Sequence, residues 1–118
     1  MNIRDLTQWQ WGGYAKYHSS RINLLIHIVA VPFFILGAAS FFLALVNFDI
    51  INTIISILLM VASMGAQGFG HAKEEVPAVP FNGPVDTVSR IFIEQLFNFP
   101  KFVFSGGWYK ALRNASPP

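Results

Sequence analysis

The amino-acid sequence predicts an all-α integral membrane protein. We expect a helical hairpin of two spans, flanked by N-terminal and C-terminal helices that are interfacial or re-entrant. Hydrophobic residues make up 53% of the 118 residues and charged residues only 12%, against ~25% in typical soluble domains. Asp49 is the one charged residue between Ile22 and Gly70. A single domain this short could not bury so much apolar surface in water.

The first three elements follow from this pattern. Residues 1–21 are rich in tryptophan and tyrosine and lack the apolar core of a secretory signal, so we expect an interfacial helix there. Residues 22–46 and 50–72 are each close to the ~20 residues that a helix needs to cross ~30 Å of hydrocarbon. The short connector between them makes the two spans an antiparallel hairpin.

The rest of the chain is less apolar. Three prolines and Gly83 predict a loop over 74–84. Residues 87–104 are predicted to form an interfacial or re-entrant helix that is broken near Pro100. Lysine and arginine precede and follow the hairpin but are absent from its connector. Both termini are therefore expected on the cytoplasmic side of a bacterial inner membrane or the endoplasmic reticulum.

Charge and small residues bear on the expected partners. The net charge is only +2 and the basic residues are scattered, which argues against nucleic acid and leaves membrane lipid as the expected surroundings. Ala62, Ala66 and Gly70 lie four residues apart, and such a face lets another helix come close. A homodimer is one use of this face; the alternative is that these positions merely face lipid.

Three histidines are predicted to meet at one membrane face. His27 lies roughly 8 Å inside the first span, at 1.5 Å per residue. His71 lies at the end of the second span, which the hairpin returns to the same leaflet, and His18 lies just before the first span. Ionisable groups at membrane depth are expensive, so their presence indicates a function. We expect these three side chains to bind a metal ion.

Further polar residues are in phase with the histidines. Asn23 precedes His27 by four residues, and Gln67, His71 and Glu75 share one helix face if the second span continues past Gly70. We expect Asn23, Gln67 and Glu75 to be catalytic or to orient the imidazoles. Neutral imidazole together with a carboxylate suits iron(II).

Other interpretations remain open from the residues alone. A histidine near an interface is usually just a hydrogen-bonded core residue, and a haem between His27 and His71 is a competitor. The protein would then be a non-catalytic membrane protein, either a bis-histidine haem electron carrier or a structural partner subunit. Glu94 is equally consistent with a supporting group of the site and with an ion-pair partner of Arg90, four residues before it.

The spacing of these residues forms two motifs: Tyr17, His18, Asn23, His27 and Pro32 in the first, and Gln67, Gly70, His71 and Glu75 in the second. Together they resemble the 2-hydroxy fatty acid dioxygenase family, which includes the fungal dioxygenase of phytosphingosine α-oxidation and its bacterial relatives. The resemblance extends from about Tyr14 to Trp108. The chain is shorter than the fungal pattern, and its loop after His71 is spaced differently, with Pro77 and Pro80.

The resemblance implies an iron(II)-dependent dioxygenase. Such an enzyme converts a 2-hydroxy fatty acid and O2 to carbon dioxide and the acid one carbon shorter. By position in the motifs, the three histidines would be the iron ligands, and Glu75 a ligand or a close support. The expected substrate-binding residues are Tyr17, Arg21, Lys73 and Arg90. The basic side chains, Lys16 among them, would draw in the carboxylate, although anchoring to anionic headgroups is the alternative role.

Overall fold

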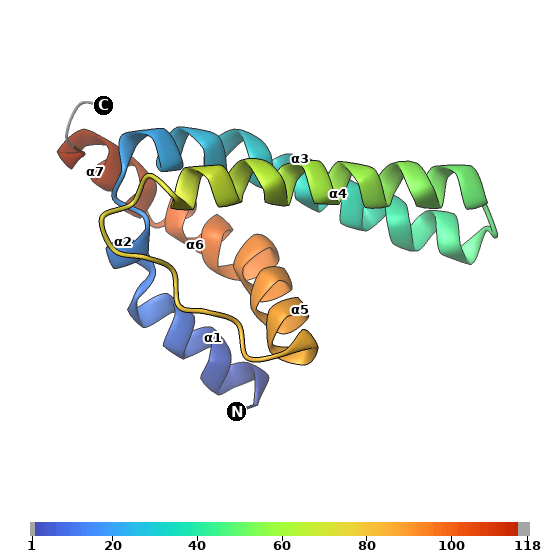
Figure 1. The fold of residues 1–118 in the computed structure, drawn as a ribbon, viewed down its shortest axis with the longest axis horizontal. Coiled ribbons are helices and arrows are strands. Elements are labelled where there is room, and N and C mark those ends of the chain that lie inside the picture. Colours follow the sequence, from blue (N-terminus) through green and yellow to red (C-terminus); the bar gives the residue numbers. More distant parts are fainter. Residues whose placement is uncertain (1, 116–118) are drawn as a thin grey trace.

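The computed structural model describes residues 2–115, and no β-strand occurs among them. The all-α class is therefore confirmed. The elements in chain order are α1 (Ile3–Gly12), α2 (Tyr14–Tyr17), α3 (Arg21–Val46), α4 (Ile50–His71), α5 (Pro84–Ile93), the π-helix η1 (Glu94–Asn98), α6 (Phe99–Phe104) and α7 (Gly107–Asn114). Figure 1 shows a long hairpin with the remaining helices gathered at one end.

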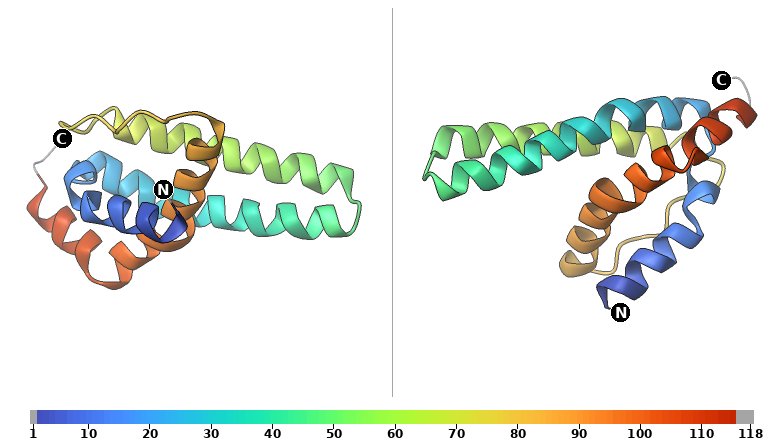
Figure 2. Two further views of the ribbon diagram at one scale, coloured as in Figure 1. Left: turned by 90° about the horizontal axis from the view of Figure 1, so that it is seen from below. Right: turned by 180° about the vertical axis from the view of Figure 1, so that it is seen from behind.

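The hairpin consists of α3 and α4, which correspond to the expected spans at 22–46 and 50–72. They lie antiparallel and side by side in all views (Figures 1 and 2). The Asp49 carboxylate caps α4 by accepting from the backbone N–H of Asn52 at 3.0 Å. Phe48, in the connector, has a φ of 54°, which turns the chain back on itself. Helix α3 runs through Pro32 without ending.

Much of the hairpin surface is apolar and exposed. Helices α3 and α4 are both long and apolar enough to cross a membrane. Large side chains such as Phe42, Leu43, Ile51, Leu58 and Val61 are exposed on them, whereas a core helix of a soluble domain would bury such side chains. The half of the hairpin next to the connector projects beyond the other helices (Figures 1 and 2). This apolar, uncovered surface suggests a membrane protein.

Polar and small residues line the contact between α3 and α4. On α4 the buried residues are Ser56, Ser63, Gln67 and Gly70. The Ser63 hydroxyl donates to the carbonyl oxygen of Ala30 across the hairpin at 2.6 Å. Of the predicted small-residue face, Gly70 packs against α3 at Asn23, whereas Ala62 and Ala66 are exposed. The close approach inside the hairpin therefore involves only one member of that face.

Replacing Gly70 with alanine is expected to destabilise the hairpin. A Cβ at this position would overlap the Asn23 side-chain oxygen and lie 3.2 Å from the Asn23 Cα, so the two backbones would have to separate. Such overpacking typically costs about 1–3 kcal/mol. Thermal unfolding in detergent, followed by circular dichroism, measures the effect. Gly65→Ala is the matched control, because a Cβ there meets nothing within 4 Å. Equal stability of the two variants would contradict the predicted close approach.

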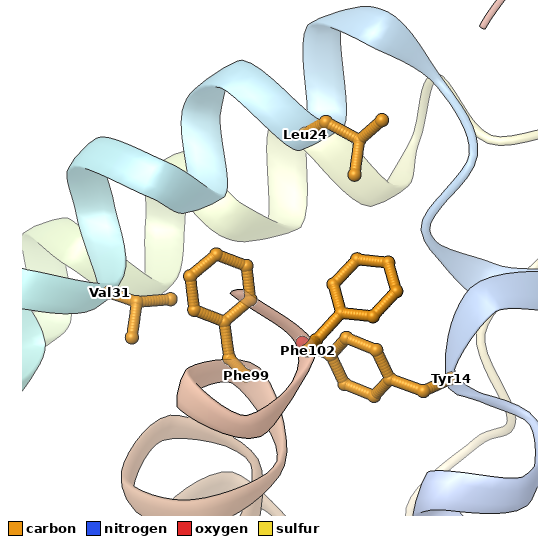
Figure 3. Packing of buried hydrophobic residues seen from close by; sticks show 5 residues of the cluster. All are labelled: Tyr14, Leu24, Val31, Phe99 and Phe102. Atoms are coloured by element: carbon orange, nitrogen blue, oxygen red, sulfur yellow. The ribbon is translucent and has the colours of Figure 1, made fainter. Parts of the chain in front are cut away.

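The other helices cover the open end of the hairpin. Their shared core contains Tyr14, Leu24, Val31, Phe99 and Phe102. Figure 3 shows Phe99 of α6 below α3 near Val31, and Phe102 of α6 beside the Tyr14 ring.

Hydrogen bonds tie the terminal helices to one another and to the hairpin. The Trp108 indole N–H of α7 donates to the Leu24 carbonyl of α3 at 2.9 Å. The Asn98 amide of η1 donates to the Gln10 side-chain oxygen of α1 at 2.7 Å. The covering helices are therefore fixed relative to the hairpin end, where the histidines lie.

The terminal helices differ from the sequence prediction. The expected single helix over 1–21 is two helices, α1 and α2, and the chain leaves helical geometry at His18. The expected helix over 87–104 begins earlier, at Pro84, and remains helical to Phe104. No break occurs at Pro100: the helix passes through the π-helical turn of η1 just before it and continues as α6. The helix α7 was not expected at all.

Candidate metal centre

Four ligand-type side chains converge at the open end of the hairpin. They are His18 after α2, His27 on α3, His71 at the end of α4 and Glu94 at the start of η1. One donor atom of each lies within 4.8 Å of all the others, so the group can hold a metal ion. The ring centroids of the three histidines are 4.8–4.9 Å apart in every pair. The structure thus brings together the three histidines that the sequence singled out.

Local capping positions His18 beside His27. After α2 the chain turns through Ser19 and Ser20, and the Ser20 hydroxyl caps α3. The Glu74 carboxylate, beyond the end of α4, accepts from the backbone N–H groups of Ser19 and Ser20 at 3.0–3.1 Å. It also accepts from the Asn23 side-chain amide at 2.7 Å. A carboxylate at a helix N-terminus is favoured by the helix dipole, so Glu74 fastens the α4 end to the α3 start.

Backbone hydrogen bonds fix the tautomers of two histidines. The Nδ1 atom of His18 lies 2.7 Å from the Tyr14 carbonyl oxygen. The Nδ1 atom of His27 lies 3.0 Å from the Asn23 carbonyl oxygen. A carbonyl oxygen only accepts, so both Nδ1 atoms carry the proton. The Nε2 atoms then face the cluster, in the arrangement by which proteins orient metal-binding imidazoles.

Two buried nitrogens of the cluster have no hydrogen-bond partner among the residues described: His27 Nε2 and His71 Nδ1. Buried polar atoms are nearly always paired, and leaving one unpaired is costly. Both residues belong to the set whose donor atoms lie within 4.8 Å of one another. A bound cation would satisfy both at once, which is the strongest local indication of a metal site.

Glu94 supplies the negative charge. Its Oε2 atom lies 3.0 Å from His18 Nε2 and 3.7 Å from His27 Nε2, and its side chain is 15% exposed. Burial alone would raise the pKa of this carboxyl, but the adjacent His18 and His27 side chains outweigh burial and hold the pKa well below its usual range.

Tyr14 adjoins the cluster, although the sequence predicts no role for it there. Its hydroxyl donates to Glu94 Oε2 at 2.9 Å. Burial, followed by the charge and hydrogen bond of Glu94, raises the pKa of Tyr14 well above its usual range, so the hydroxyl remains a donor.

Glu75 does not take part in the cluster. Helix α4 ends at His71, and the chain turns through the next residues, so the spacing of four no longer places Glu75 on the face of His71. Glu75 is exposed, and the carboxylate of the site comes from Glu94 instead. The Arg90 side chain pairs with Asp86 at 3.3 Å, which leaves Glu94 to the histidines.

Asn23 and Gln67 support the site without adding donor atoms to it. Asn23 contributes its backbone carbonyl to His27. Gln67 exchanges two amide hydrogen bonds with Gln95 of η1, at 2.8 and 2.7 Å, and also donates to Ser63. This amide pair holds η1 against α4 next to Glu94. Gln67 lies on the same face of α4 as His71, as expected, but it hydrogen-bonds Gln95 of η1 and not a group of the cluster.

A cavity of about 660 Å³ lies directly beside the cluster. His18, His71 and Glu94 form part of its wall. The remaining wall is largely aromatic or aliphatic and includes Trp9, Tyr17, Met64, Phe81 and Ile91. It is lined by α1, α2, α4, α5 and the loop that follows α4, and it is partly open to the outside. An apolar molecule with one polar end therefore has room next to the four donors.

The predicted substrate-binding residues separate into two groups. Tyr17 and Arg90 line the cavity, whereas Arg21 and Lys73 do not. The Arg90 guanidinium is already occupied: it donates to the carbonyl oxygens of Val79 and Pro80 at 2.8 and 3.0 Å. It also lies over the Phe81 ring, 4.4 Å from the ring centroid. Arg90 thus secures the loop that forms one cavity wall.

Comparison with known proteins assigns no family to this chain. No family model, curated protein or solved structure matches the chain. The donor set itself carries the chemical argument. Imidazole nitrogen with carboxylate oxygen suits first-row divalent transition metals and zinc, whereas oxygen-only sets suit magnesium and calcium.

Proposed function

We propose that the protein is an iron(II)-dependent dioxygenase at the membrane face, which oxidatively decarboxylates a 2-hydroxy fatty acid. The observation that carries the proposal is the cluster of three histidines and Glu94 at the wall of a largely apolar cavity. The spacing of the histidine motifs, which resembles that of the 2-hydroxy fatty acid dioxygenases, supports the choice of reaction.

The residues suit a non-haem ion. His18, His27, His71 and Glu94 would hold it, and such a set of imidazoles and a carboxylate suits non-haem iron. Bound iron(II) would polarise the hydroxy acid and activate oxygen. A haem between His27 and His71 is disfavoured, because His18 and Glu94 project into the space that the flat macrocycle would need.

The reaction balances without a further reductant. The bond between C1 and C2 of the 2-hydroxy acid breaks, C1 leaves as carbon dioxide, and C2 becomes the carboxyl carbon of the shorter acid. The substrate loses four electrons, which reduce one O2, and water is the remaining product. The protein therefore needs only the hydroxy acid, oxygen and the metal.

The cavity fits the shape of such a substrate. Its aromatic and aliphatic wall would hold the alkyl chain and keep water from the metal, while the carboxylate and hydroxyl reach the cluster. Met64 and Gly68, on the apolar helix α4, form part of the wall, so a substrate dissolved in the bilayer would have a short path to the site. Lys16 at the same wall would attract the carboxylate.

The proposed orientation places the site at the cytoplasmic face. Helices α2 and α7 lie at the end of the hairpin away from the connector (Figure 1). The four donors lie there too, because they cluster around His27 near the start of α3 and His71 at the end of α4. Lysine and arginine are concentrated in the segments before and after the hairpin. The positive-inside rule then directs this end toward the cytoplasm.

Oxygen dependence tests the reaction. Purified protein loaded with iron(II) is expected to release one carbon dioxide for each O2 consumed when given a 2-hydroxy fatty acid. Product should vanish under argon, because oxygen accepts all four electrons. Carbon dioxide release from a substrate labelled at C1 and an oxygen electrode measure the two quantities. The unhydroxylated fatty acid of equal length is the control and should not react. Turnover without oxygen would exclude a dioxygenase.

A further inference from the structure

Tyr14 contacts two of the four donor residues. It is 2% exposed, and its ring stacks on the His18 ring with centroids 3.9 Å apart and an interplanar angle of 7°. Its backbone carbonyl accepts from His18 Nδ1 at 2.7 Å. Its hydroxyl donates to Glu94 Oε2 at 2.9 Å. One residue therefore touches a histidine of the N-terminal segment and the carboxylate of the C-terminal helix.

The hydroxyl is the part of Tyr14 that restrains Glu94. Besides His18, it is the hydrogen-bond partner of this carboxylate among the residues described. The carboxylate otherwise borders the open cavity, where it could rotate away from the histidines. The stacked ring and the carbonyl, in contrast, act on His18 and need no hydroxyl.

We propose that Tyr14 is a positioning residue of the metal centre, whose hydroxyl holds the Glu94 carboxylate toward the three histidines. The proposal rests on the metal-binding part of the proposed function and not on its reaction. It predicts that removing the hydroxyl alone weakens metal binding and changes the coordination geometry, while the helices stay intact.

Tyr14→Phe tests this directly, because phenylalanine keeps the ring and the carbonyl. Cobalt(II) is the probe, since its visible spectrum reports ligand geometry and its titration gives the affinity. We expect the affinity to fall by ~10–100-fold, as for other groups that orient metal ligands, with an altered cobalt spectrum. Tyr17→Phe is the matched control: it removes a hydroxyl from the same short helix and the same cavity, but from a residue outside the cluster.

A double-mutant cycle shows whether the hydroxyl acts through Glu94. In a Glu94→Gln background, Tyr14→Phe is expected to have no further effect on cobalt affinity, because the carboxylate it positions is gone. Additive losses would overturn the proposal. So would a wild-type affinity and spectrum in Tyr14→Phe.

Two other results, misfolding of Tyr14→Phe and failure of the wild type to bind cobalt, can be told apart from a failure of the positioning role. If Tyr14→Phe loses its helical circular dichroism, 3-fluorotyrosine incorporated at position 14 changes the donor strength of the hydroxyl with little change in size. An unaltered cobalt spectrum in that protein would count against the proposal. If the wild-type protein binds no cobalt, the metal centre itself fails, and with it the proposed function. If the wild type and Tyr14→Phe bind cobalt with the same affinity and spectrum, only the positioning role of Tyr14 is refuted.

Discussion

Replacing His27 or His71 with alanine is expected to abolish bound iron while leaving the hairpin in the membrane. Each residue belongs to the cluster of four donors and has a buried ring nitrogen with no hydrogen-bond partner among the residues described. Removing a ligand should cost more affinity than the ~10–100-fold typical of a group that only orients one. Elemental analysis of the purified variants measures iron, and resistance of the protein to carbonate extraction measures insertion.

The control for these variants is Ser63→Ala. Ser63 is also a buried polar residue of α4 and lies two turns before His71, but it offers no donor atom to the cluster. It should retain full iron occupancy. Full occupancy in both histidine variants would end the metal-site proposal and favour a structural subunit. A strong Soret band in the visible spectrum of the wild type would instead favour a haem carrier.

The hairpin and the meeting of the histidines were predictable because both depend on simple properties of the sequence. A stretch with Asp49 as its one charge gives two helices of membrane length, and the short connector forces them to fold back. His27 near the start of the first helix and His71 at the end of the second must then lie at the same level. This part of the site follows from topology alone, without knowledge of packing.

The fourth donor was not predictable in the same way. Glu94 reaches the histidines only because η1 packs against α4 and α1, through Gln95 and Asn98. Those contacts join residues far apart in the chain, and periodicity does not reveal them. The sequence also offers Arg90 two carboxylates at equal spacing, Asp86 and Glu94, and only the structure shows that it pairs with Asp86.

Glu75 was predicted at the site because a helix that continued past Gly70 would have placed it there. The sequence has no proline directly after His71 to mark the helix end, and helix ends are the least predictable part of an element. In the structure Glu74, not Glu75, turns back to cap α3. The missed helix α7 has a related cause: Gly106, with a φ of 84°, turns the chain into a new helix instead of ending the helical region.

Replacing either Glu94 or Glu75 with glutamine distinguishes the ligand set found in the structure from the ligand set predicted from the sequence. Glu94→Gln keeps the size of the side chain but removes the charge, so three neutral imidazoles would face a divalent ion alone. We expect its iron(II) affinity to fall at least as far as the ~10–100-fold seen for orienting groups. Glu75→Gln should bind iron as the wild type does, because this residue is exposed and outside the cluster. Anaerobic iron(II) titration of both variants gives the comparison.

The reverse result would have a definite meaning. If Glu75→Gln lost iron and Glu94→Gln kept it, the chain after α4 would have to rearrange on metal binding, so that the helix continued past His71. The Glu74 carboxylate would then have to release the backbone of Ser19 and Ser20, to which it is bound in the structure. Because that release would uncap α3 at the turn that carries His18, it would disturb the very histidine that the metal needs. The cap thus favours Glu94 as the carboxylate ligand on energetic grounds as well as on distance.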